Sequence, residues 1–318
     1  MTLAFLFPGQ GAQAVGMGRA LAEAEPLARE TFERADAALG IPLTRIMWEG
    51  PEDELRKTVH AQPALLSHGV AAWRLLEGAG VRPGFTAGHS LGEYTACVAA
   101  GALSFEDAIR LVHRRGELMY RAGIERPGTM AAILGLDADA VHEACSEARP
   151  AGVVVAANLN APGQVVISGE VGAVERACEV ARARGAKRAI RLVVSGAFHS
   201  PLMGSAAEGL RAALALVELR DAEWPVVCNV DAKPVRRAAE IRDALERQLL
   251  GAVRWEESMR LLLESGVEGF VEAGTGKVLR GLLRTIDREA RSWNVEDPDS
   301  LRETLAALEA ADAARERG

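Results

Sequence analysis

The sequence predicts an α/β fold into which a second, smaller module is inserted. The chain has 318 residues, and at roughly 150 residues per domain this length corresponds to about two folding units. Short apolar runs alternate with helical patterns along most of the chain, as they do in α/β proteins. Over residues 126–195 the order is strand, helix, strand, strand, helix, strand, which is the split βαβ pattern of a ferredoxin-like module.

The large unit is predicted to comprise residues 1–125 and 196–318. It begins with a buried strand over 3–7 and a glycine-rich turn. A single helical pattern follows and carries Met17, Leu21, Ala24, Ala28, Phe32 and Leu39. The next predicted elements are a helical stretch over 65–73, a strand over 85–88, and helices over 91–100 and 105–121. Ser104, with Asp107 three residues on, predicts the N-cap of the last of these helices.

The inserted unit, 126–195, and the second half of the large unit continue the alternation. The inserted unit is predicted to contain strands over 129–136, 153–160, 164–169 and 187–194, with helices over 137–149 and 170–185. Beyond it we expect a helix over 203–217, a strand over 225–231, a helix over 238–250 and a strand over 269–274. Ser300 and Glu303 predict the cap of a final helix, whose apolar stripe is Leu301, Leu305 and Leu308.

The composition excludes several classes of protein. Lys and Arg number 37 against 44 Asp and Glu, so the net charge of −7 gives no general attraction to nucleic acid or to an anionic membrane. Aromatic residues make up only 4%, too few to suggest a base-stacking platform. A membrane-spanning helix needs an apolar run of about 18 residues or more, and no run in this sequence approaches that length. The four cysteines lie far apart, so we expect neither disulfides nor a metal knuckle, and a cytoplasmic setting.

The segment Gly88-His89-Ser90-Leu91-Gly92 matches G-x-S-x-G, the nucleophile elbow, in which a serine sits on a sharp turn between a strand and a helix. The flanking runs FTAG and LGEYTACVAA have the strand and helix character that such a turn requires. We therefore expect Ser90 to be a nucleophile. A glycine-serine turn without chemistry is the alternative interpretation.

A serine nucleophile needs a general base, and His199 is the best candidate among six histidines. It lies in an irregular loop between a predicted strand and a predicted helix, where catalytic groups of α/β folds usually sit. It also follows Ser90 in chain order, as the base does in elbow-type hydrolase folds. His113 and His142 lie in ordinary helical patterns, and nothing is paired with His60 or His68. A capping or loop role is the alternative for His199.

An oxyanion hole requires two hydrogen-bond donors. The amide of Leu91, directly after the nucleophile, is one candidate, and the flexible turn around Gln10 is placed to supply the other. A phosphate-binding loop is the competing interpretation of this turn. However, PGQGAQAVGMG lacks both the Lys-Ser/Thr pair and the acidic residue of the nucleotide-binding motifs.

Two polar residues fall on apolar helix faces. Arg115 lies beside an apolar stripe of its helix, whereas Arg114 points the other way. A buried guanidinium requires an anion, so Arg115 forms either an ion pair within the protein or a clamp on a substrate carboxylate. The amide of Gln248 also needs a partner, and orienting a catalytic histidine is one candidate. The turn over 272–277 either binds an anion through its backbone or is structural.

Taken together, the motifs resemble those of the malonyl-CoA:acyl-carrier-protein transacylase family. The resemblance covers nearly the whole chain, including FPGQGAQ (7–13), GHSLGEYTA (88–96), RRGELM (114–119), GTMAAILG (128–135), NLNAPGQVVISG (158–169), FHSPLM (198–203), NVDAKP (229–234) and EAGTGKVLRGL (272–282). It implies a large α/β-hydrolase-like domain with a parallel sheet and an inserted ferredoxin-like subdomain.

The resemblance also implies roles for individual residues. Ser90 would be the nucleophile and His199 its base, and the amides of Gln10 and Leu91 would be the oxyanion donors. Arg115 would grip the malonyl carboxylate, and a carbonyl partner at Gln248 would orient the histidine in place of an acid. Phe198 and His89 would complete the substrate site, with Phe198 crowding out an α-methyl branch.

The activity implied is transfer of malonyl from malonyl-CoA to the phosphopantetheine thiol of a holo acyl carrier protein. We expect it to serve fatty-acid or trans-acting polyketide synthesis, in a monomer without a metal or cofactor. Two alternatives stay open: a hydrolase of acyl-carrier-protein or acyl-CoA thioesters on the same scaffold, and a non-catalytic module that docks carrier protein. Arg115 argues against the hydrolase, because removing simple acyl groups does not need its charge. An intact Ser90 and His199 argue against the docking module.

Overall fold

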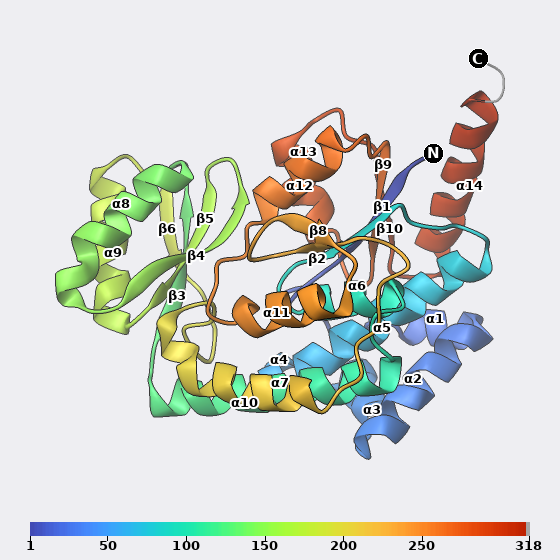
Figure 1. Ribbon diagram of the computed structural model, residues 1–318, viewed down its shortest axis with the longest axis horizontal. Coiled ribbons are helices and arrows are strands. Elements are labelled where there is room, and N and C mark those ends of the chain that lie inside the picture. The colour runs from blue at the N-terminus through green and yellow to red at the C-terminus, as the bar shows by residue number, and fades with distance from the viewer. Residues whose placement is uncertain (316–318) are drawn as a thin grey trace.

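The computed structural model describes residues 1–315, which fold around two separate β-sheets (Figure 1). The predicted α/β class is confirmed. The larger sheet has six strands in the spatial order β10 (Ser292–Val295), β9 (Gly269–Ala273), β1 (Leu3–Phe7), β2 (Phe85–Gly88), β7 (Val226–Cys228) and β8 (Lys233–Val235). Neighbouring strands are parallel except for the edge pair β7 and β8.

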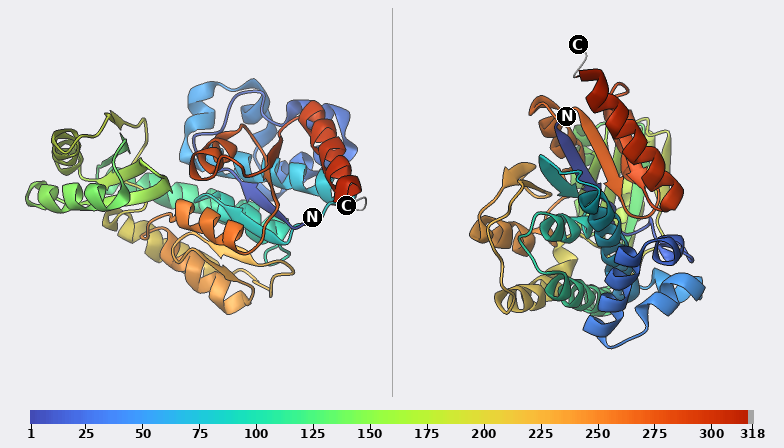
Figure 2. Two further views of the ribbon diagram at one scale, coloured as in Figure 1. Left: turned by 90° about the horizontal axis from the view of Figure 1, so that it is seen from above. Right: turned by 90° about the vertical axis from the view of Figure 1, so that its right-hand side faces the viewer.

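Helices cover both faces of this sheet (Figure 2). They are α1 (Arg19–Ala24), α2 (Pro26–Leu39), α3 (Leu43–Glu49), α4 (Glu52–Arg56), α5 (Thr58–Gly78), α6 (Gly92–Ala99), α7 (Phe105–Glu125), η2 (Pro201–Met203), α10 (Gly204–Ala215), α11 (Ala238–Gln248), α12 (Trp255–Glu264), α13 (Val278–Ile286) and α14 (Pro298–Arg315). β1 shows why both faces are covered: Phe5 and Phe7 enter the core shared with α5, α6 and α7, whereas Ala4 and Leu6 enter a second core with α12 and α13. Buried parallel strands of this kind are apolar at every position.

The second sheet belongs to a smaller unit that projects to one side of the molecule (Figures 1 and 2). Its elements in chain order are β3 (Thr129–Leu134), α8 (Ala138–Ala148), η1 (Arg149–Ala151), β4 (Val154–Ala161), β5 (Gln164–Gly169), α9 (Val171–Ala183) and β6 (Arg188–Arg191). The spatial order β4-β5-β3-β6, antiparallel throughout, is that of a split βαβ fold. Most of its buried apolar side chains form a core of their own, whereas Met130, Ala157 and Val166 join the core of the large unit.

Several local predictions are confirmed and others are wrong. Ser104 caps α7 by accepting the Asp107 amide at 3.1 Å, although the helix runs on to Glu125. The single helix expected between Met17 and Leu39 is two helices, because Pro26 has no N–H to continue α1 and instead begins α2. The strand predicted over 187–194 is confined to β6, and β8 and β10 were not foreseen.

The predicted cap of the last helix is also wrong. α14 begins at Pro298, ahead of Ser300. The Asp297 carboxylate accepts the Ser300 amide at 2.8 Å, and the Ser300 hydroxyl accepts the Asp297 amide at 3.0 Å. Asp297 is therefore the cap, and Ser300 is its partner in the first turn. Leu301 and Leu308 are buried and Leu305 packs against the same core, so the predicted apolar stripe is confirmed.

The order of the large sheet brings three loops together. β1, β2 and β7 are neighbours, and the carboxyl ends of parallel strands lie at one edge of a sheet, where α/β proteins bind their ligands. The turn after β2 crosses the end of β1 so closely that the His89 amide donates to the Phe7 carbonyl at 3.0 Å. A Cβ on Gly92 would lie 2.0 Å from that same carbonyl oxygen. The second glycine of the elbow is therefore required for this crossing.

We expect Gly92→Ala to destabilise the protein, because overpacking of this kind costs about 1–3 kcal/mol or more. Gly281→Ala is the matched control: Gly281 lies in α13, and a Cβ there would meet nothing within 4 Å. Alanine is the better helix former by about 1 kcal/mol. In chemical denaturation the first variant should unfold at lower denaturant than the wild type, and the second at equal or higher denaturant. Equal midpoints for the two variants would contradict the close crossing.

Candidate active site

Ser90 and His199 form a hydrogen-bonded pair at the end of β2. Ser90 Oγ lies 2.7 Å from His199 Nε2. Both residues have left-handed backbone conformations, with φ of 50° at Ser90 and 57° at His199, and such conformations persist in non-glycine residues where surrounding structure holds them. The two residues therefore meet because both loops adopt strained turns at the same edge of the sheet.

Two main-chain carbonyls orient the His199 ring. Nδ1 lies 3.0 Å from the Gln248 carbonyl oxygen and 3.2 Å from that of Gly251. A carbonyl accepts only, so Nδ1 carries the proton and Nε2 presents a lone pair to the Ser90 hydroxyl. Burial, reinforced by the nearby charge of Arg115, lowers the pKa of His199 to about 3. The imidazole is therefore neutral near pH 7, the form that a general base requires.

The structure accounts differently for the two halves of Gln248. Its main-chain carbonyl contacts His199, but its side-chain amide does not. Instead Nε2 donates to the Ser90 carbonyl at 2.8 Å, and Oε1 accepts from Arg115 Nη2 at 3.1 Å. The catalytic histidine, one candidate partner for this amide, is therefore not among its contacts, and it is the main-chain carbonyl of Gln248 that contacts His199.

Arg115 is fully buried and has no acidic partner within residues 1–315 at ion-pair distance. Its Nη1 donates to Gln62 Oε1 at 2.8 Å, and its Nη2 donates to Ser90 Oγ and Gln248 Oε1, both at 3.1 Å. The Tyr94 ring lies 5.4 Å from the guanidinium, and the Arg115 Nε atom has no partner among the described residues. The ion pair considered from the sequence is thus absent here, and the buried Glu93 acts on Arg115 only at longer range, beyond Gln248.

Arg114, the neighbouring residue on α7, behaves as the helix periodicity predicts. Its side chain is 43% exposed and pairs with Glu117 at 2.8 Å. The two consecutive arginines therefore have opposite environments, one in water and one against the nucleophile.

The amides of Gln10 and Leu91 lie on the two turns that the oxyanion prediction named. Gln10 follows β1 and Leu91 follows Ser90. Within residues 1–315 neither N–H donates to a protein acceptor, whereas the Ser90 N–H donates to Asn229 Oδ1 at 2.7 Å. The Gln10 side chain is held separately, since its Oε1 accepts from Thr58 at 3.0 Å. The main-chain N–H groups of Gln10 and Leu91 are therefore free to donate to an oxyanion.

His89 and Phe198 each lie next to a dyad residue in the chain; His89 is half-buried and Phe198 is buried. His89 Nε2 lies 2.8 Å from Asn160 Oδ1 on β4, and its ring packs against Trp255. Phe198 is 8% exposed and belongs to the main core of the large unit. His89 thus links the elbow to the smaller sheet.

Sequence reasoning missed three residues that surround Ser90: Gln62, Glu93 and Asn229. Each is buried, and each reaches the site from a different element, namely α5, the first turn of α6, and the end of β7. Glu93 lies within the GHSLGEYTA motif, and Asn229 lies within NVDAKP. The signal that could have identified them is a polar residue flanked on both sides by apolar ones.

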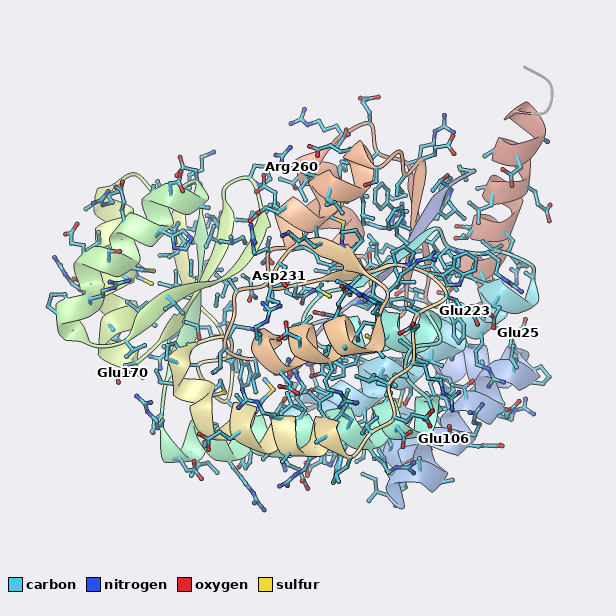
Figure 3. The ribbon with its side chains drawn as sticks, viewed as in Figure 1. Glu25, Glu106, Glu170, Glu223, Asp231 and Arg260 are labelled. Atoms are coloured by element: carbon cyan, nitrogen blue, oxygen red, sulfur yellow. The ribbon has the colours of Figure 1, made fainter. Side chains whose placement is uncertain are left out.

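An ion pair fixes the end of α11 that carries Gln248. Arg247 donates to both carboxylate oxygens of Asp231, at 3.0 and 2.5 Å. Asp231, labelled in Figure 3, lies in the loop that follows β7. Bidentate pairing of this kind defines orientation as well as distance. It anchors the residue next to Gln248 on the loop that also carries Asn229.

Two other sequence features are structural. His68, expected to be unpaired, is buried and contacts Thr275 Oγ1 at 2.6 Å and the Glu296 carbonyl at 3.0 Å. Within the turn over 272–277, the buried Glu272 carboxylate accepts the Leu279 and Arg280 amides at the start of α13. The Gly276 N–H within the turn donates to Glu296 Oε2 at 2.9 Å, so the anion found at this backbone is a carboxylate of the chain itself.

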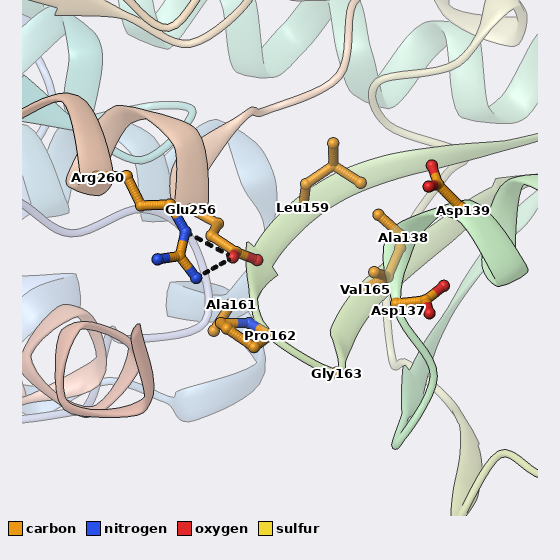
Figure 4. Close-up of a pocket in the computed structure, with 10 residues that line it drawn as sticks. All are labelled: Asp137, Ala138, Asp139, Leu159, Ala161, Pro162, Gly163, Val165, Glu256 and Arg260. Atoms are coloured by element: carbon orange, nitrogen blue, oxygen red, sulfur yellow. Dashed lines mark hydrogen bonds and ion pairs between the residues drawn. The ribbon is translucent and has the colours of Figure 1, made fainter. Parts of the chain in front are cut away.

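A cavity of about 320 Å³ lies away from the dyad, between the β4–β5 turn, the start of α8, and α12 (Figure 4). Its charged lining residues are Asp137, Asp139, Glu256 and Arg260. Arg260 is already paired with Glu256 at 2.7 Å, and Asp137 caps α8. The lining therefore offers neither a nucleophile nor an unpaired cation.

Comparison with known proteins agrees with this geometry. Residues 4–297 match the acyl transferase domain family, so the class of protein is an acyltransferase. The chain is 47% identical to the malonyl CoA-acyl carrier protein transacylase of Bacillus subtilis, over 96% of this chain and 97% of the relative, and 46% identical to that of Escherichia coli K12, over 96% and 98%. The chain belongs to the malonyl-CoA:acyl-carrier-protein transacylase family.

Solved structures show the same two-sheet fold. An acyl-carrier-protein S-malonyltransferase from Burkholderia pseudomallei has a TM-score of 0.93 at 47% identity, covering 96% of this chain and 100% of that one. A malonyl-transacylase in complex with a type II PKS acyl-carrier protein has a TM-score of 0.94 at 45% identity, with the same coverage.

No helix in the described part of this chain has the length and apolar character needed to cross a bilayer.

The protonation state of His199 can be measured directly. A free histidine has a pKa of about 6.5, whereas the pKa of His199 is lowered to about 3. We expect ¹⁵N NMR of histidine-labelled protein to show His199 neutral, with its proton on Nδ1, between about pH 5 and pH 8, with free histidine as the reference. A transition of the His199 signals near pH 6.5 would contradict the burial argument.

Proposed function

We propose that this protein transfers malonyl from malonyl-CoA to the phosphopantetheine thiol of a holo acyl carrier protein through an ester on Ser90. The observation that carries this proposal is the buried guanidinium of Arg115, which makes no direct ion pair and whose Nη2 lies 3.1 Å from Ser90 Oγ. A buried cation without an acid is costly unless an anion arrives to pair with it. A short acyl group that ends in a carboxylate supplies that anion while it is bound to the serine.

The first half-reaction forms the ester and releases CoA. As Ser90 Oγ attacks the thioester carbonyl, its proton passes to His199 Nε2, and the negative charge collects on the former carbonyl oxygen. We assign the free amides of Gln10 and Leu91 to this oxygen. When the tetrahedral intermediate collapses, His199 returns the proton to the leaving CoA sulfur.

The second half-reaction runs the same steps in reverse with a different thiol. The phosphopantetheine thiol gives its proton to His199 and attacks the malonyl-Ser90 carbonyl. Collapse of the intermediate then breaks the ester bond and restores the Ser90 hydroxyl with the proton from His199. Arg115 holds the far end of the malonyl group in both halves, which keeps the reacting carbonyl near Ser90. We assign Phe198 to exclusion of an α-methyl branch.

Three further properties belong to the proposal. We take residues 126–195 as a domain inserted between 1–125 and 196–318, because the smaller sheet has its own apolar core. We propose a cytoplasmic location, in keeping with four cysteines that are all unpaired and buried. We expect the protein to act as a monomer in fatty-acid or trans-acting polyketide synthesis.

Ser90→Ala should abolish the malonyl adduct. Intact-protein mass spectrometry after incubation with malonyl-CoA should show a one-to-one adduct on the wild type and none on the variant. Addition of a holo carrier protein should discharge the wild-type adduct to the carrier faster than water does. Discharge mainly to water would indicate the hydrolase, and carrier binding without any adduct would indicate the docking module.

Arg115→Ala should separate malonyl from acetyl. We expect malonyl transfer to fall by about 100-fold or more, since charged hydrogen bonds contribute about 1.5–3 kcal/mol each, whereas acetyl transfer is kept or increased. Arg114→Ala is the matched control, because its side chain is exposed and paired with Glu117. Initial rates with both thioesters provide the measurement. Equal losses of malonyl and acetyl transfer in Arg115→Ala would make its role structural.

A further inference from the structure

One carboxylate oxygen lies behind the two side chains that hold the Ser90 backbone. The Ser90 carbonyl also accepts the main-chain N–H of Glu93, at 3.1 Å. Glu93 Oε2 accepts from Gln248 Nε2 at 2.7 Å and from the main-chain N–H of Asn229 at 3.1 Å. The same two residues hold Ser90: Gln248 Nε2 also donates to the Ser90 carbonyl at 2.8 Å, and Asn229 Oδ1 accepts the Ser90 N–H at 2.7 Å. Both peptide groups of Ser90 are thus held by residues that meet at Glu93.

These contacts act on a strained backbone. The φ of 50° at Ser90 is left-handed, a conformation that costs a non-glycine residue free energy and persists only where neighbours hold it. Asn229 also donates from Nδ2 to the Gly88 carbonyl at 2.8 Å, so its side chain spans the turn. Loss of the anchor behind Asn229 and Gln248 would release this turn.

The contacts also fix the orientation of the Gln248 amide. The Ser90 carbonyl and the Glu93 carboxylate accept hydrogen bonds, so the amide atom that faces both must be Nε2. Oε1 then faces Arg115 Nη2, which can only donate. Glu93 makes no ion pair with Arg115. Glu93 reaches Arg115 only through the Gln248 side chain, so the side of the guanidinium that faces Ser90 has no acidic partner.

We propose that Glu93 is a positioning residue for the nucleophile: by anchoring Asn229 and Gln248, it holds Ser90 in the conformation that aims Oγ at His199. This inference rests on the proposed role of Ser90. It requires an oxygen acceptor at the reach of a glutamate side chain. A role as the distant counter-charge of Arg115 would instead require the negative charge, and the two requirements can be separated by substitution.

The test uses Glu93→Gln, which keeps the reach without the charge, and Glu93→Asp, which keeps the charge but is one methylene too short. Glu272→Gln is the matched control, since Glu272 is another fully buried carboxylate and contacts only the start of α13. The full chain is mixed with malonyl-CoA or acetyl-CoA, quenched, and weighed, so that the limiting rate of Ser90 acylation and the half-saturating concentration are obtained separately.

We expect Glu93→Asp to lower the limiting rate by about 10- to 100-fold, the scale of a small misplacement of a reacting group. The loss should be the same for both thioesters, and the half-saturating concentration should stay within about threefold, since binding contacts are kept. Glu93→Gln should lose no more than about threefold in rate. Glu272→Gln should change the unfolding midpoint and not the limiting rate.

Three results would overturn the inference. Glu93→Asp could acylate at the wild-type rate, Glu93→Gln could be as slow as Glu93→Asp, or the loss could be confined to malonyl-CoA, which would point to the charge on Arg115. Should Glu93→Asp not fold, Asn229→Ala tests the contact that the anchor supports: alanine keeps the main-chain N–H that Glu93 accepts but removes the Oδ1 that holds the Ser90 N–H. It should show the same loss of limiting rate. Failure of the proposed function is a distinct result, because the wild type itself would then give no adduct on Ser90.

Discussion

The arrangement of the site depends on the sharp, left-handed turn at Ser90. A strand must end and a helix begin within a few residues, and the turn must cross the end of β1 in contact with its last carbonyl. Only glycine at position 92 leaves room for that crossing. Because the turn stands at the carboxyl edge of the parallel sheet, residues from β1, β7, α7 and α11 all reach it. The hydroxyl of Ser90 meets His199 and Arg115, while its peptide groups meet Asn229 and Gln248.

The site also holds an unpaired positive charge next to a neutral base. Arg115 is surrounded by the side-chain amide oxygens of Gln62 and Gln248 and by the ring face of Tyr94. These groups solvate a cation without neutralising it. Burial, reinforced by the same charge, keeps the pKa of His199 low and its imidazole ready to accept a proton. The guanidinium thus favours an anionic acyl group, whereas the protonation state of the base depends chiefly on burial.

The smaller sheet adjoins this arrangement directly. The Leu159 amide donates to the Val253 carbonyl, and the Val253 amide donates to the Ala157 carbonyl, each at 2.8 Å. Val253 lies just beyond Gly251, one of the two residues whose carbonyls orient His199. With His89 bonded to Asn160, β4 therefore borders both halves of the dyad. The inserted unit thus contacts the loops that carry both dyad residues, although most of its buried apolar side chains form a separate core.

The sequence alone determined the features whose causes are local. Strand and helix periodicity, the cap at Ser104 and the glycines around Ser90 depend on neighbours within a few residues, and the burial of Arg115 follows from its place on one helix face. The partners of buried polar groups depend instead on which elements the tertiary fold brings together. Only the structure decided that Arg115 lacks an acid, that the carbonyl rather than the amide of Gln248 faces His199, and that Glu93 meets Asn229, 136 residues away. These contacts join α6, β7, α7 and α11, and no periodicity within a single element encodes them.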